Sequence, residues 1–245
     1  MKVPRAARVR VNAEGEDDMP RKLQQSASRA PSVRRRPSAS PVDLPSPKLG
    51  RGKSLPESLR LRRTTREIDA RPLPLQLLSN LLWAASGVNR RTGPFGTPGL
   101  TAASASNSQD IDLYVAMERG VYRFEPRRHR LLPVLAGDLR PLAIGRGQKA
   151  MVTEAPVQII YVADVHRLTH TAGFQEPGLH DPEVQKSYYY ADTGLIAGNV
   201  YLYAASQGLA CWFHNCDRAG LGRKLKLRAE QRVLFAQTVG YPERR

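Results

Sequence analysis

Residues 183–207 read EVQKSYYYADTGLIAGNVYLYAASQ and form the stretch on which the fold depends. A helix of this length spans about 37 Å. The run is apolar nearly all round and is broken by Asp192 and Asn199, and a helix of that kind is buried on several sides. Because the core of this chain is modest, such burial suggests a second subunit that covers one side. We interpret the tyrosines of the run as packing rather than as cofactor contacts.

Apolar runs on either side of this helix predict strands and further helices. The run 157–162 is too continuously apolar for an edge strand and should lie centrally, and a hairpin is expected to turn at Glu118-Arg119-Gly120. We expect strands at 111–117, 121–124, 129–135, 157–162, 209–213 and 232–239. We expect helices from Ser54, over 74–86, over 138–150 and after the capping residue Asp217. The polar insertion 164–182 is interpreted as a lid over a substrate pocket.

The first 53 residues differ in composition from the rest. They hold 13 basic and 5 acidic residues, interleaved with serine and proline and almost without aliphatic side chains, which predicts a disordered tail. Order is expected to begin at Ser54, where a capping hydroxyl is followed by Pro56 and Glu57. We therefore divide the chain into a disordered Arg/Ser/Pro-rich tail, 1–53, and a domain, 54–245. No apolar h-region follows the arginine clusters, so we expect neither export nor a membrane span, and a cytoplasmic protein.

Charge and cysteine content limit the possible functions. The chain has 38 Lys and Arg against 22 Asp and Glu, a net charge of +16, which suits a polyanion or a phosphorylated ligand. Cys211 and Cys216 cannot form a metal-finger framework and do not indicate a disulfide-built domain, so a reducing compartment is expected. His166 and His170 would share a helix face, but no cysteine or carboxylate stands at a matching ligand spacing. We expect no metal site.

The run Arg62-Arg63-Thr64-Thr65-Arg66 concentrates three guanidinium groups and two hydroxyls at the far end of the first helix. Guanidinium offers a planar fork to phosphate oxygens, and threonine hydroxyls can add a hydrogen bond. The run is therefore a candidate anion cradle. A solvated basic surface is the alternative that the residues leave open.

Residues 87–108 are rich in Gly, Pro, Thr, Ser and Asn and predict a long irregular connection. Long loops within compact domains tend to be functional. The small residues around Ser104 would let the backbone approach a flat ligand, and the Asn107 amide could bond to a heterocycle edge. An ordinary surface loop remains the alternative.

Several motifs, taken in order, resemble the nitroreductase-like flavoproteins, and within them the SagB/ThcOx-type dehydrogenase branch. The likeness starts with Arg62–Arg66, Pro72-Leu73-Pro74 and Leu78–Ala85. It continues through Tyr114–Ala116, Gly120–Phe124, Tyr161–Asp164, Ala191–Gly194, Asn199–Leu202 and Val239–Pro242. It covers residues 50 to 242, and the succession of motifs is more specific than any single one.

The resemblance implies an α+β, nitroreductase-like fold with a central, mostly antiparallel sheet flanked by helices, a long buried central helix and a bound FMN. It also implies a homodimer with active sites at the interface. Arg62, Arg63, Thr64 and Arg66 match the family's phosphate and ribityl contacts. Ser104 and Asn107 match a loop that reaches the flavin from the partner, and His214 and Asn215 match a turn whose backbone lies near the reactive edge. Arg244 and Arg245 fall where some relatives place a late phosphate contact.

The expected reaction follows from the cofactor, since flavin N5 carries hydride and no protein side chain is expected to be catalytic. Reduction of nitroaromatics or quinones by NAD(P)H and oxidation of a small or peptide-derived donor both remain open, in each case by a ping-pong scheme. The alternatives are a flavin-storing protein without turnover and a basic polyanion-binding or nucleic-acid-binding protein. With an FMN site expected, nucleic acid is the less favoured partner.

Overall fold

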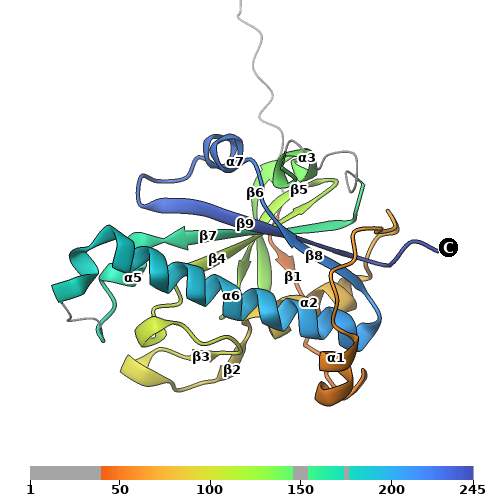
Figure 1. Ribbon diagram of the computed structural model, residues 1–245, viewed down its shortest axis with the longest axis horizontal. Coiled ribbons are helices and arrows are strands. Elements are labelled where there is room, and N and C mark those ends of the chain that lie inside the picture. The colour runs from red at the N-terminus through yellow and green to blue at the C-terminus, as the bar shows by residue number, and fades with distance from the viewer. Residues whose placement is uncertain (1–39, 146–153, 174–176, 245) are drawn as a thin grey trace, which may run out of the picture. The chain divides into compact units, whose positions relative to one another are not determined.

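The computed structural model describes residues 40–145, 154–173 and 177–244, and in this part of the chain the main element is a seven-stranded sheet (Figure 1). The strand order is β1-β6-β5-β4-β7-β9-β8, and every neighbouring pair is antiparallel. Its strands are β1 Val42–Asp43, β4 Ile111–Met117, β5 Gly120–Glu125, β6 Arg130–Ala136, β7 Val157–Asp164, β8 Ala210–His214 and β9 Gln231–Gly240. The strands β2 Val88–Arg90 and β3 Gly99–Leu100 form a separate pair.

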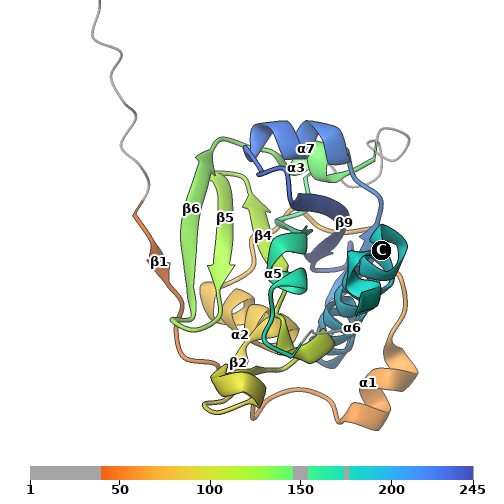
Figure 2. The same ribbon diagram turned by 90° about the vertical axis from the view of Figure 1, so that its left-hand side faces the viewer.

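Helices cover both faces of the large sheet. The described α-helices are α1 Leu55–Leu61, α2 Leu75–Ser86, α3 Arg140–Ala143, α5 Val165–Thr169, α6 Pro182–Gln207 and α7 Arg218–Lys224. The two views place α2 and α6 on one face and α3 and α7 on the other (Figures 1 and 2). The strand β7 lies in the sheet between these two layers of helices and is buried at all eight positions, which confirms its predicted central place. The fold is therefore the predicted α+β arrangement.

The long helix α6 confirms the element predicted at 183–207. The Asp181 carboxylate accepts a hydrogen bond from the backbone of Glu183, and Gly208 ends the helix with a φ of 68°, a conformation that glycine adopts without strain. One side, including Ile196 and Val200, packs into the core. The opposite side leaves Leu195 50% exposed, so a single chain buries this helix on one side.

The start of the ordered region differs from the prediction. Order does not begin at Ser54, because Val42–Asp43 pairs with β6 and Leu44 is buried against the core. A short alternation of apolar side chains within the proline-rich segment is enough to add an edge strand. Residues 1–39 of the predicted tail lie outside the described residues.

The helix predicted over 138–150 is also shorter in the structure. Of the described residues 138–145, Arg140–Ala143 is helical, and Ile144 is extended with ψ 132°. Residues 146–150 lie outside the described part. In the polar insertion, α5 is followed by a 3₁₀ turn, η4 Pro177–His180. Among the described residues no helix is long and apolar enough to cross a membrane, and no three potential ligands gather into a metal site.

Candidate functional site

The predicted anion cradle begins where α1 ends. The Ser54 hydroxyl accepts a hydrogen bond from the backbone of Glu57, which caps the start of the helix, as the sequence predicted. At the other end Arg62 has an extended conformation, so the chain leaves the helix there. The backbone of Thr65 then donates to the carbonyl of Cys211 at 3.0 Å. The arginine run is thus held against strand β8.

Tyr201 of α6 fixes the same segment from the helix side. Its hydroxyl oxygen accepts a hydrogen bond from the backbone of Phe213 at 2.9 Å and lies 3.1 Å from the Thr64 hydroxyl. Its ring lies beneath the Arg62 guanidinium, 5.5 Å from the ring centroid. One side chain therefore joins the helix, the edge strand and the arginine run.

A groove of about 420 Å³ opens beside these residues, which is a size typical of small-molecule sites. Its cationic lining comprises Lys53, Arg60, Arg62 and Arg63. No ion pair with an acid is found for any of these four among the described residues. Unpaired cations beside a groove favour an anionic ligand, and guanidinium groups are suited to bind phosphate bidentately.

The carboxy-terminal segment lies next to the cradle. Ile68 forms a β-bridge with Pro242, and the backbone of Glu243 donates to the carbonyl of Glu67 at 3.1 Å. Arg244 follows directly in the sequence. The structure therefore brings the late arginine to the same part of the molecule as the arginine run, whereas Arg245 lies outside the described residues.

His214 and Asn215 stand at the end of β8. The His214 ring is buried, with Nε2 2.8 Å from the Thr238 hydroxyl and Nδ1 2.8 Å from the carbonyl oxygen of Asn215. Burial lowers the pKa of this histidine, which favours the neutral ring. Both ring nitrogens are engaged, and the Asn215 side-chain oxygen accepts from Arg218 at 3.1 Å. The turn can therefore offer a ligand its backbone and the Asn215 amide nitrogen rather than a free imidazole.

Aromatic packing connects this turn with the arginine run. The Arg66 guanidinium lies 5.3 Å from the centroid of the Trp212 ring, and the Trp212 and His214 rings are 4.4 Å apart. Strand β8 thus brings together two of the predicted groups of site residues. Neither sequence spacing nor charge indicated this contact.

Ser104 and Asn107 lie elsewhere in the chain and do not line the groove. The Ser104 hydroxyl accepts from the backbone of Gln109 at 2.9 Å. The Asn107 amide donates to the carbonyls of Pro94 and Thr97 at 3.4 and 3.3 Å. Both side chains therefore support the fold of their own loop, and within one chain the structure does not unite them with the arginine run.

A carboxyl pair that the sequence analysis missed holds this loop on α6. The backbone of Ala105 donates to Asp192 at 3.0 Å, and the Asp192 and Asp110 carboxyls hydrogen-bond to each other. Burial, together with the charge of Asp110, raises the pKa of Asp192 to about 7. In the sequence, Asp192 stands out only as a polar break in an apolar helix. The pattern around Tyr201 likewise predicts packing, and no local signal identifies its partners.

Comparison with known proteins gives consistent matches. A model described as "Nitroreductase family" matches residues 59–241. The protein MJ1384 of Methanocaldococcus jannaschii, which bears a nitroreductase name, is 32% identical over 155 residues, 60% of this chain and 71% of that protein. A crystal structure assigned as a nitroreductase of Ralstonia eutropha JMP134 is 35% identical, with a TM-score of 0.72, and the match covers 85% of this chain and 92% of that one.

The fold is also shared with more distant structures. The NADPH:FMN oxidoreductase of Vibrio harveyi, crystallised with NAD⁺, is 18% identical with a TM-score of 0.54, over 78% of this chain and 69% of that one. At this identity the likeness concerns the fold alone.

Proposed function

The chain belongs to the nitroreductase family and has the fold of an oxidoreductase, and from this premise we propose that it is an FMN-dependent enzyme working by a ping-pong scheme. In such a scheme one donor leaves the substrate slot before the acceptor enters it. The single observation that carries the proposal is the groove beside Arg62 and Arg63, whose cations have no acid partner among the described residues.

The residues of the cradle are suited to bind FMN. Arg62, Arg63 and Arg66 would hold the phosphate, and Thr64 would hold the ribityl chain while Tyr201 keeps its hydroxyl in place. FMN, when bound, supplies a hydride acceptor and donor at N5 of its ring. The His214–Asn215 turn would present its backbone to the flat ring. With both imidazole nitrogens engaged, His214 would position that turn and would not exchange protons with substrate.

We propose a homodimer in which the partner supplies Ser104 and Asn107 to the cofactor. Their separation from the arginine groove in one chain supports this arrangement. NAD(P)H is a fitting reductant because a neighbour of the same fold is an NADPH:FMN oxidoreductase. We also propose that the enzyme is of the SagB type and that the protein is cytoplasmic. Its substrate would be a nitroaromatic, a quinone or a peptide-derived donor.

The cofactor test begins with the colour of the purified protein. We expect yellow protein that releases FMN on denaturation. Replacing two charge-assisted contacts in the variant Arg62→Ala/Arg66→Ala should weaken FMN binding on the order of 100-fold, with unchanged circular dichroism. The matched control, Arg119→Ala/Arg223→Ala, removes the same charge from exposed positions away from the groove. Unchanged FMN affinity in the first variant would contradict the assignment.

The substrate test is an anaerobic titration followed by flavin absorbance. Addition of NADH, NADPH and a panel of small donors in turn should bleach the flavin with at least one of them, and a nitroaromatic or quinone should restore the colour. Parallel double-reciprocal plots would support the ping-pong scheme. Yellow protein that no donor bleaches would indicate flavin storage, and colourless protein that copurifies with nucleic acid would indicate the polyanion-binding alternative.

A further inference from the structure

A second pocket, of about 440 Å³, lies where β4 begins and β5 ends. The loop that carries Phe95 and Asn107 lines one side of it, and α5 contributes Arg167. Its apolar lining includes Phe95, Leu100, Ile111, Leu113 and Phe124. None of the residues that line the arginine groove lines this pocket, so the two sites are distinct within one chain.

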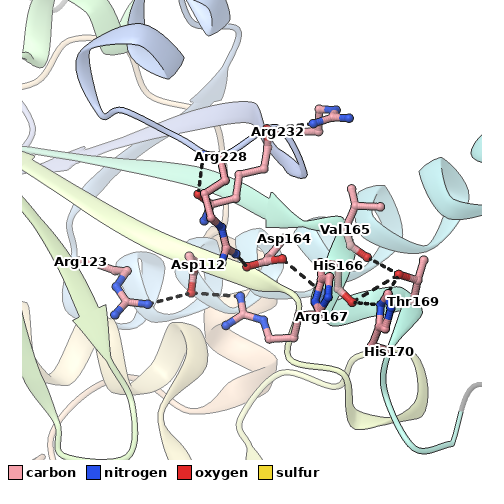
Figure 3. A network of polar contacts seen from close by, with 11 residues as sticks. Asp112, Arg123, Asp164, Val165, His166, Arg167, Thr169, His170, Arg228 and Arg232 are labelled. Carbon is pink, nitrogen blue, oxygen red and sulfur yellow. Dashed lines mark hydrogen bonds and ion pairs between the residues drawn. The ribbon is translucent and has the colours of Figure 1, made fainter.

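Three arginines give this pocket its charge. Asp112 lies between Arg123 and Arg167, at 3.8 Å from the first guanidinium and 3.0 Å from the second (Figure 3). One carboxylate is thus paired with two guanidinium groups. The third, Arg127, has no acid partner in the described part of the chain, and the lining acid Glu125 is paired with Arg130. The pocket therefore keeps an excess of positive charge.

Arg167 is held without a full set of hydrogen bonds. Its Nε atom and the terminal nitrogen that lies 3.0 Å from Asp112 are both buried and have no hydrogen-bond partner among the described residues. Buried donors are nearly always paired with protein, water or a ligand. The Arg167 side chain is 36% exposed and lines the pocket, so an acceptor bound there would lie beside this guanidinium and that of Arg127.

The backbone around the pocket is held in a costly conformation. Four of the six non-glycine residues with positive φ in the described ranges line this pocket: Phe95, Ser106, Asn107 and Gln109, with φ of 57°, 48°, 54° and 51°. Strained residues of this kind cluster at ligand sites, where the surrounding structure holds them in place. Phe95 is also 59% exposed, a large apolar side chain at the mouth of the pocket.

From these observations we propose that the pocket binds a small molecule with a flat apolar body and one carboxylate. The body would pack between Phe95 and Phe124, and the carboxylate would accept hydrogen bonds from Arg127 and Arg167. A monoanion fits better than a phosphate dianion because Asp112 and Glu125 already place two negative charges on the lining. Asn107, which lines this pocket, is also a residue proposed to reach the partner's cofactor. The Arg62→Ala/Arg66→Ala variant therefore separates a failure of this proposal from a failure of the proposed function.

Fluorine NMR with para-fluorobenzoate as the probe tests the proposal on the full chain. We expect the fluorine resonance of para-fluorobenzoate to broaden and shift when the protein is added. The neutral counterpart, para-fluorobenzamide, should bind at least about tenfold more weakly, because the amide lacks the charge-assisted hydrogen bonds of the carboxylate. Inorganic phosphate should not displace the probe. Equal binding of acid and amide, displacement by phosphate, or no binding at millimolar protein would each overturn the proposal.

Variants locate the probe. Arg127→Gln should weaken binding about tenfold without loss of a protein contact, whereas Arg223→Gln, an exposed arginine on α7, should bind as the parent does. Binding should survive in Arg62→Ala/Arg66→Ala, which separates this pocket from the cofactor groove. Binding that persists in Arg127→Gln but is lost in the double variant would place the probe in the other site and contradict the proposal.

Discussion

Asp110 and Asp192 show how one buried pair can connect a loop with the central helix. Both carboxyls are buried, and burial is the main cause that raises the pKa of each. Two carboxyls that touch in a buried site hold a proton between them, because both cannot ionise at low cost. With Ala105 bonded to Asp192, this proton helps to hold the loop that carries Ser104 and Asn107.

The substitution Asp192→Asn tests this pair. The folded protein keeps a proton on Asp192 up to about pH 7, whereas the unfolded carboxyl, with a pKa of 3.8, releases it earlier. The free energy of unfolding of the parent therefore falls as the pH rises through this window and is level above it. Over the same pH range we expect the free energy of unfolding of the variant to fall by about 2 kcal/mol less than that of the parent, after allowance for solvent screening.

Urea unfolding at a series of pH values measures the difference. Asp43→Asn, at an exposed position in β1, serves as the control and should keep the pH dependence of the parent. If Asp192→Asn and the parent gave parallel curves between pH 3.8 and about 7, the shared proton would be refuted.

At the scale of elements, the strand β8 forms one edge of the sheet and is covered by two segments. Uncovered edge strands invite pairing with other chains. Here the carbonyl of Cys211 accepts from Thr65, and the backbone of Phe213 donates to Tyr201. The predicted cofactor cradle is therefore also the element that closes this edge, which ties the position of the arginines to the stability of the sheet.

The variant Tyr201→Phe removes the hydroxyl that joins the edge to the cradle. We expect a loss of about 1 kcal/mol in the free energy of unfolding, because the groove is open to water that can replace the lost acceptor. Hydrogen exchange of the Phe213 and Thr65 amides should become faster. Tyr122→Phe is the control, since its hydroxyl has no hydrogen-bond partner among the described residues. Unaltered protection of Phe213 in Tyr201→Phe would show that the hydroxyl does not fix the edge.

At the scale of the whole molecule, the exposed side of α6 indicates where a second chain would bind. Tyr190 and Leu195 are 41% and 50% exposed, and nothing lies within 4 Å of a side-chain carbon added at Gly194 or Gly198. Small residues beside large apolar ones let another backbone approach closely. This exposed side is the best candidate for the interface of the proposed homodimer.

The variant Leu195→Glu tests the interface. A carboxylate buried without a partner costs several kcal/mol, so we expect the parent to sediment as a dimer and the variant as a monomer. The monomer should also bind FMN more weakly, since the partner's Ser104 and Asn107 would be lost. Val134→Glu, at a 38% exposed position in β6, should remain dimeric. A dimeric Leu195→Glu would exclude this side of α6 as the interface.

The elements that the sequence predicted correctly are those with a local signal. The caps at Ser54 and Asp217 are made by short side chains that bond to backbone two or three residues away. The hairpin between β4 and β5 was also predicted, with Glu118 and Arg119 forming the turn and Gly120 pairing with Met117. The helix expected over 138–150 ends at Ala143, where Ile144 turns extended, and the strand at Val42–Asp43 was missed because only its pairing with β6 reveals it.

The sequence by itself determined the succession of most of the main helices and strands, the concentration of arginines at 62–66 and the membership of a family, because each resides in neighbouring residues or their succession. Only the tertiary structure decided that Tyr201 holds the cradle, that Trp212 joins Arg66 to His214, and that the Asp110 and Asp192 carboxyls meet. These contacts join residues far apart in the chain. Their strength comes from burial and mutual geometry, which arise only once the sheet and α6 have packed together.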